Sequence, residues 1–82
     1  MLEVEHRPNF LRTMRRIKDD SIKRQIKKQI KKIIENPEIG KPMRYSRKWT
    51  RELHIGSFRI SYAYLKSENK IIFLDLYHKN NQ

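Results

Sequence analysis

Residues 50–66 constrain the fold of this chain most strongly, because apolar and polar side chains alternate on both sides of Gly56-Ser57. Such alternation is typical of strands with one buried face, and a short turn that begins with glycine joins two strands into a hairpin. The turn also fixes the register, which places His54 directly opposite Arg59. Since opposite residues share a face of the sheet, the segment predicts a hairpin whose second face carries a cation.

The register divides the side chains of this hairpin into two sets. The face directed to the core carries large apolar or aromatic residues, namely Leu53, Ile55, Phe58, Ile60, Tyr62 and Tyr64. The opposite face carries Glu52, His54, Arg59 and Ser61. Residues 70–77 predict a third strand, so that 50–55, 58–66 and 70–77 form an antiparallel meander. His78 and Lys79 follow it and are expected to reach the rim near Arg59 if the third strand lies beside the second.

The first half of the chain predicts a short strand and two helices. Residues 2–6 alternate like a strand, and Pro8 suits the first turn of a helix over 9–17. Residues 21–35 form a second helix with an isoleucine stripe, which Asn36-Pro37 ends because the residue before proline avoids helical backbone angles. Residues 36–42 read as a loop. We therefore expect one α+β domain over 1–82, with a helical hairpin packed on one face of the sheet.

Composition limits the protein's partners and its location. The 82 residues include 20 Lys+Arg against 9 Asp+Glu, a net charge of +11, and no cysteine. A small domain of this charge meets polyanions on electrostatic grounds, although a lysine-rich surface also reflects AT-rich or thermophilic genomes. No apolar run approaches the roughly 20 residues of a membrane span. We expect a cytoplasmic protein with no membrane partner and no disulfide or zinc.

Cations alternate with aromatic residues in 41–51, as expected for an RNA-binding segment in which cations meet phosphates and rings stack on bases. The residues concerned are Lys41, Arg44, Tyr45, Arg47, Lys48, Trp49 and Arg51. Alternatively, Tyr45 or Trp49 packs in the core and the loop is merely solvated. The lysines of the second helix are best interpreted as a solvated face that attracts polyanions at long range.

The polar face of the hairpin combines groups suited to phosphate chemistry. Arg59 can grip a phosphate with two hydrogen bonds, and His54 and Glu52 can accept or donate protons. The simpler alternative is a solvated ladder in which Glu52 only pairs with Arg59, because antiparallel sheets often expose one face.

Three motifs resemble the RelE/ParE superfamily, the toxins of type II toxin–antitoxin modules. They are GKPMRY at 40–45, RELHIGSFRISYAY at 51–64 and KIIFLDLYHK at 70–79. The resemblance implies the same fold and, for a RelE-like member, a ribosome-dependent endoribonuclease that cuts mRNA by attack of the ribose 2′-OH, with no metal or other cofactor. It also implies that Arg59 holds the scissile phosphate, His78 transfers a proton and Lys79 stabilises charge.

The sequence departs from the RelE pattern at four places, one of which is Lys79, where the pattern has an arginine. RelE-like toxins carry lysines where Thr50 and Glu52 stand here, and the chain lacks their tyrosine near the C-terminus. Glu52 or His54 is then expected to supply the base. The implied partners are the ribosome and a cognate RelB-like antitoxin, acidic or helical, in a heterotetramer with the toxin. A ParE-like gyrase inhibitor and a non-catalytic or degenerate nucleic-acid-binding relative remain as alternatives.

Overall fold

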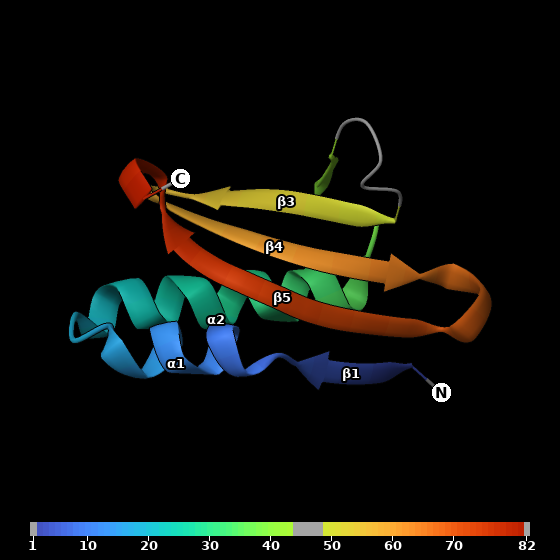
Figure 1. Cartoon of the computed structure of the whole chain (residues 1–82), viewed down its shortest axis with the longest axis horizontal. Coiled ribbons are helices and arrows are strands. Elements are labelled where there is room, and N and C mark those ends of the chain that lie inside the picture. Colours follow the sequence, from blue (N-terminus) through green and yellow to red (C-terminus); the bar gives the residue numbers. More distant parts are fainter. Residues whose placement is uncertain (1, 44–48, 82) are drawn as a thin grey trace.

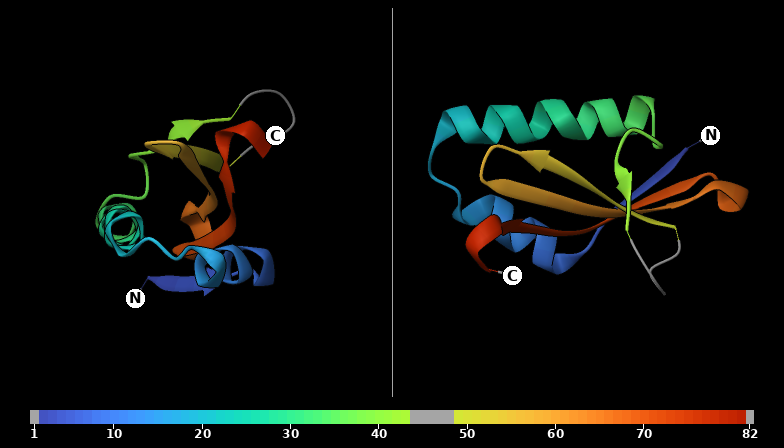
Figure 2. Two further views of the ribbon diagram at one scale, coloured as in Figure 1. Left: turned by 90° about the vertical axis from the view of Figure 1, so that its left-hand side faces the viewer. Right: turned by 90° about the horizontal axis from the view of Figure 1, so that it is seen from above.

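A computed structural model describes residues 2–43 and 49–81. Two helices lie on one side of a twisted five-stranded sheet, whose strand order is β1-β5-β4-β3-β2 (Figures 1 and 2). The helix α1 packs against β5, and α2 packs against β3. The expected α+β class, with the helices on one face, is confirmed. The face of the sheet opposite the helices is called the open face below.

Both helices begin and end close to the expected residues. The first, α1 (Pro8–Arg16), has Pro8 in its first turn, where the missing N–H costs no hydrogen bond. The second, α2 (Asp20–Glu35), begins after Asp19, whose carboxylate accepts hydrogen bonds from the backbone N–H groups of Ser21 at 2.8 Å and Ile22 at 3.3 Å. Neither helix has the length and apolar character that crossing a bilayer requires, and the same holds for every helix within 2–43 and 49–81.

The meander consists of β3 (Thr50–Ile55), β4 (Phe58–Leu65) and β5 (Lys70–His78). The predicted register of the first hairpin is confirmed, including the pairing of His54 with Arg59. Gly56 has φ +55°, a left-handed conformation that glycine adopts without steric cost. Short 3-10 helices, η1 (Lys66–Glu68) and η2 (Lys79–Asn81), follow β4 and β5.

Two edge strands complete the sheet. The expected N-terminal strand, β1 (Glu3–His6), pairs in parallel with β5. The strand β2 (Lys41–Pro42) pairs antiparallel with β3, in a segment that the sequence predicted as a loop. Two residues are too few to show an alternating pattern, and proline is compatible with a strand only at a sheet edge. This short edge strand matters because it places Lys41 opposite Glu52.

The core lies between the helices and the sheet. Its fully buried side chains come from both helices and from the two central strands: Phe10, Ile26, Ile33, Ile60, Tyr62, Ile71, Phe73 and Leu76. Ile60 and Tyr62 lie on the face that the sequence predicted as buried. The core therefore leaves the opposite side of β3, β4 and β5 free for polar groups.

A bulge in β5 decides which of its residues reach the open face. Tyr62 pairs with Phe73 but the preceding Ser61 pairs with Asp75, so Leu74 is an extra residue on β5. Before the bulge, odd-numbered residues such as Phe73 point to the core. After it, the alternation is reversed, and Tyr77 lies on the open face.

Candidate active site

Four side chains form an open-face cluster on three adjacent strands: Glu52, His54, Arg59 and Tyr77. Arg59 stands on the central strand β4, directly opposite His54 on β3 and directly opposite Tyr77 on β5. Glu52 lies two residues before His54 on the same face of β3. The hairpin turn and the β5 bulge thus bring a cation, a carboxylate, an imidazole and a phenol together.

Glu52 is the centre of the hydrogen bonds in this cluster. The Tyr77 hydroxyl donates to Oε2 of Glu52, while Oε1 lies 3.1 Å from Nε2 of His54. Burial acts to raise the pKa of Glu52, but the hydrogen bonds from Tyr77 and His54, together with the charges of His54 and Arg59, lower it below its ordinary value. Glu52 is therefore a carboxylate at neutral pH, and its side chain is 21% exposed.

Arg59 is held by backbone carbonyls and not by an acid. Its Nη1 donates to the carbonyl oxygens of Gly56 at 3.2 Å and Phe58 at 3.1 Å. Among the described residues no ion pair joins Arg59 to Glu52, whose oxygens are occupied by Tyr77 and His54. The direct Glu52–Arg59 ion pair of the simpler interpretation is therefore not formed among the described residues, although the charge of Arg59 still acts on Glu52. The guanidinium is oriented by the turn and has nitrogens left for an anion.

Tyr77 is the site residue that sequence reasoning missed. Burial, followed by its hydrogen bond to Glu52 and the charge of that carboxylate, raises the pKa of Tyr77 to about 12. The phenol therefore remains a hydrogen-bond donor at neutral pH. The sequence does contain a signal for its position: strict alternation from Ile71 and Phe73 would bury Asp75. A bulge that returns Asp75 to the open face also brings Tyr77 there.

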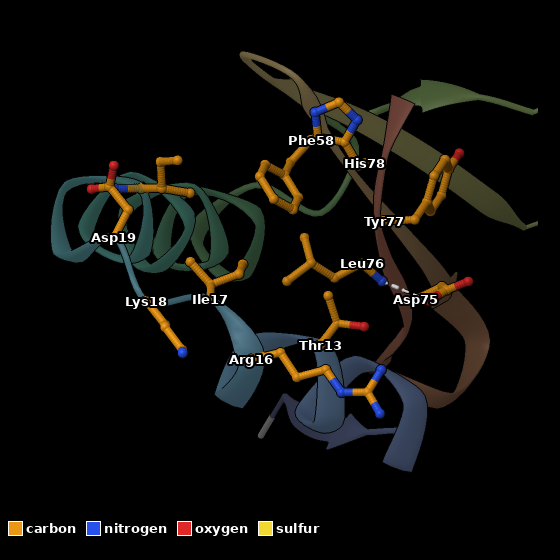
Figure 3. Close-up of a pocket in the computed structure, with 11 residues that line it drawn as sticks. Thr13, Arg16, Ile17, Lys18, Asp19, Phe58, Asp75, Leu76, Tyr77 and His78 are labelled. Carbon is orange, nitrogen blue, oxygen red and sulfur yellow. Dashed lines mark hydrogen bonds between the residues drawn. The ribbon is translucent and has the colours of Figure 1, made fainter. Parts of the chain in front are cut away.

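His78 does not share the rim with Arg59, contrary to expectation. The bulge pairs His78 with Phe58, on the helix side of the sheet, and the two rings meet edge-on with centroids 5.4 Å apart (Figure 3). Figure 3 shows Tyr77 and His78 on opposite sides of β5. Lys79 is exposed beside the hairpin turn, where its backbone N–H donates to the carbonyl oxygen of Ser57 at 2.7 Å.

An open groove of about 550 Å³ lies on the helix side, next to His78 (Figure 3). Apolar side chains form part of its lining, and Arg16 and Lys18 contribute cations: the apolar members are Ile17, Ile22, Phe58 and Leu76. Asp19 and Asp75 also line it, but both accept hydrogen bonds from backbone N–H groups. Tyr77 of the open-face cluster also contributes to the lining, so the groove borders the strand β5 that carries this part of the cluster.

The predicted RNA-binding segment is only partly described. Arg44, Tyr45, Arg47 and Lys48 lie outside the described residues, so their placement stays a prediction. Trp49 is 68% exposed, and the alternative that it packs in the core is wrong.

The residues at the two ends of that segment, Lys41 and Arg51, point to opposite sides of the sheet. Lys41 is exposed on the open face, as an RNA contact requires. Arg51 points to the helix side, where its Nη1 donates to the carbonyl oxygens of Glu38 at 3.0 Å and Gly40 at 2.7 Å. Arg51 therefore holds a loop of the protein itself.

Several solved structures with the same fold are described as toxins or toxin–antitoxin complexes. The chain has a TM-score of 0.78 and 14% identity to a structure of the E. coli RelBE toxin–antitoxin complex, over 93% of this chain and 94% of the other. The RelBE2 toxin–antitoxin complex of Mycobacterium tuberculosis gives a TM-score of 0.78 and 18% identity, over 94% of this chain and 96% of the other. A YoeB/ParE toxin from Agrobacterium tumefaciens gives a TM-score of 0.80 and 11% identity, over 94% of this chain and 98% of the other.

A sequence-family model identifies the family to which the chain belongs. Residues 4–82 match the model described as the ParE toxin of the type II toxin–antitoxin system parDE. The chain belongs to this family and is a toxin of the type II toxin–antitoxin class. The comparison with curated proteins gives no match. The family and fold therefore define the toxin class, and the choice of target rests on the site.

Proposed function

We propose that this toxin is a ribosome-dependent mRNA endoribonuclease that acts in the cytoplasm through the open-face cluster. One observation carries the proposal: the guanidinium of Arg59 forms no ion pair with an acid among the described residues, yet it shares the open face with the hydrogen-bonded carboxylate of Glu52 and imidazole of His54. In a solvated cross-strand ladder with no chemical role, Glu52 and Arg59 would form an ion pair. The arrangement instead supports binding of a phosphate next to groups that transfer protons.

The proposed reaction is an internal transfer at one phosphate of the RNA. Glu52 accepts the proton of the ribose 2′-OH as its oxygen attacks the adjacent phosphorus. The P–O5′ bond breaks, giving a 2′,3′-cyclic phosphate and a 5′-OH, and His54 donates a proton to the leaving 5′ oxygen. Arg59 binds the non-bridging oxygens, where negative charge accumulates in the transition state.

Tyr77 has a supporting role in this proposal. Its hydroxyl holds one oxygen of Glu52, which orients the carboxylate and keeps it ionised. Lys79, exposed at the end of β5, remains a proposed charge-stabilising group, whereas the position of His78 on the helix side favours His54 for proton transfer.

A cognate antitoxin is the proposed partner that controls the toxin. Two of the structurally similar toxins are described in complexes with their antitoxins, RelBE and RelBE2. The net charge of +11 favours an acidic partner. We propose that a RelB-like antitoxin covers the basic surface in a heterotetramer.

Inhibition of DNA gyrase is a second candidate function. The family model that matches the chain is that of ParE toxins, and the lysines of RelE-like toxins are absent at Thr50 and Glu52. A gyrase inhibitor would bind protein and would not depend on a proton-transfer cluster. The two candidates therefore differ in whether the open-face cluster is needed.

The test compares wild type, Arg59→Ala and Arg24→Ala in a translation extract. Arg24 is exposed on α2 and serves as a control for the loss of one arginine charge. Primer extension on a translated reporter mRNA is expected to show discrete cuts with wild type and Arg24→Ala and none with Arg59→Ala. Intact mRNA together with inhibited supercoiling by purified gyrase would contradict the proposal and support the gyrase target.

A further inference from the structure

Two side chains fix the loop that leads into β2. The buried hydroxyl of Tyr62 donates to the carbonyl oxygen of Pro37 at 2.7 Å and accepts from the backbone N–H of Gly40 at 2.9 Å. Arg51 holds the carbonyl oxygens of Glu38 and Gly40 from the same side of the sheet. The chain enters β2 directly after Gly40, so these four hydrogen bonds, together with the pairing of β2 with β3, position Lys41.

Gly40 shows how closely this loop is fitted. A Cβ atom at this position would lie 2.5 Å from the hydroxyl oxygen of Tyr62 and 2.8 Å from its Cε1. Only glycine allows the backbone to approach the tyrosine in this way. The loop is therefore pre-organised by the core and carries Lys41 in a defined position.

Lys41 is directly opposite Glu52, on the same face as Arg59. Two inter-strand spacings across the sheet and two residues along it put the Cα atoms of Lys41 and Arg59 about 12 Å apart. Long side chains at this separation can meet neighbouring phosphates of one RNA strand. The ammonium group of Lys41 forms no ion pair with an acid in the described part of the chain, although Glu52 is its cross-strand neighbour.

We propose that Lys41 is a second phosphate-binding residue of the open face, and that Tyr62 and Arg51 are positioning residues that hold it there. Lys41 supplies, from the neighbouring strand, a cation that positions 50 and 52 of this chain do not provide. The RNA then crosses the open face from Arg59 over Glu52 toward β2. This inference rests on the proposed endoribonuclease function.

The first experiment measures kcat/KM for cleavage of a ribosome-bound mRNA as a function of salt, for wild type, Lys41→Gln and Lys32→Gln. Lys32, exposed on α2, controls for the loss of one positive charge. Lys41→Gln is expected to lose about ten-fold in kcat/KM, and its log–log salt slope is expected to be about 0.7 smaller in magnitude, as for one lost single-strand phosphate contact. Lys32→Gln is expected to stay within two-fold of wild type.

The second experiment tests the positioning role with a double-mutant cycle of Tyr62→Phe and Lys41→Gln. Tyr62→Phe keeps the buried ring but removes the hydrogen bonds to Pro37 and Gly40. It is expected to reduce kcat/KM about five-fold in the wild-type background and less than two-fold in the Lys41→Gln background, because the cation it positions is then absent. Equal losses in both backgrounds would overturn the positioning role, since a merely structural effect does not depend on residue 41.

The outcomes separate this inference from the function on which it rests. Cleavage by Lys41→Gln at the wild-type rate and with the wild-type salt slope would overturn the inference and leave the endoribonuclease intact. Absence of cleavage by wild type, together with no binding of a 2′-deoxy-substituted RNA of the same sequence, would overturn both.

Discussion

Replacing Tyr77 by phenylalanine is expected to destabilise the protein by an amount that depends on the charge of Glu52. The substitution retains the ring on the open face and removes only the hydroxyl that donates to Oε2 of Glu52. A hydrogen bond to a charged acceptor contributes about 1.5–3 kcal/mol, and one between neutral groups about 1 kcal/mol. Since Glu52 is a carboxylate at neutral pH, we expect a loss of about 2 kcal/mol at pH 7.

The sign of the pH dependence follows from the pKa of Glu52. Its pKa is lowered in the folded protein, so the associated stabilisation is present above the ordinary value of 4.5 and is lost as the pH falls through the folded value. Tyr77→Phe removes one cause of this lowering. The difference in the free energy of unfolding between wild type and Tyr77→Phe should therefore shrink by about half as Glu52 becomes protonated.

Urea denaturation at a series of pH values from 7 to about 3 measures this difference for a two-state protein. Tyr64→Phe is the matched control, because the Tyr64 hydroxyl makes no hydrogen bond with another described residue and should contribute less than about 0.5 kcal/mol. A loss for Tyr77→Phe that is equal at every pH, or that does not exceed the Tyr64→Phe value at pH 7, would refute the reasoning.

Four further substitutions, one of them a control, test the scaffold that positions the site. Gly40→Ala should lower the free energy of unfolding by about 2 kcal/mol in urea, since the new Cβ would lie 2.5 Å from the hydroxyl of Tyr62; unchanged stability would show that the loop can move away. Ile33→Ala should cost about 3 kcal/mol because the side chain is fully buried, whereas Ile34→Ala, at 37% exposure, should cost less than about 1 kcal/mol; similar midpoints in thermal denaturation would contradict this packing. Asp19→Ala should cost about 1 kcal/mol and reduce helical circular dichroism on heating, because α2 loses its N-cap; an unchanged melting curve would show that the cap contributes nothing.

The sequence predicted the hairpin at the centre of the site because two independent constraints agree there. The alternation of side chains defines the strands, and the turn at Gly56-Ser57 fixes the register to a single residue. The positions of His54 and Arg59 followed from these constraints and are confirmed. The two helices could also be predicted, because Pro8 marks the start of the first and Asn36-Pro37 marks the end of the second.

The far side of the site could not be predicted in the same way. The alternation of apolar and polar residues does not reveal a bulge. A bulge adds one residue to the strand, and every residue that follows it then points to the opposite face of the sheet. The bulge at Leu74 exchanges the faces of Tyr77 and His78. The strand β2 has two residues and no alternation, and the hydrogen bonds that hold its loop come from Arg51 and Tyr62, which are distant in sequence.

Cleavage of RNA by the open-face cluster requires the ribose 2′-OH as the nucleophile, and a synthetic mRNA that lacks this hydroxyl at one nucleotide is the sharpest test of this requirement. Programmed ribosomes would carry an mRNA with either a ribose or a 2′-deoxyribose at the nucleotide before the cleaved phosphate. We expect cleavage of the ribose form to a 2′,3′-cyclic phosphate and a 5′-OH, and no cleavage of the deoxy form. Equal cleavage of both forms, or none of either, would contradict it.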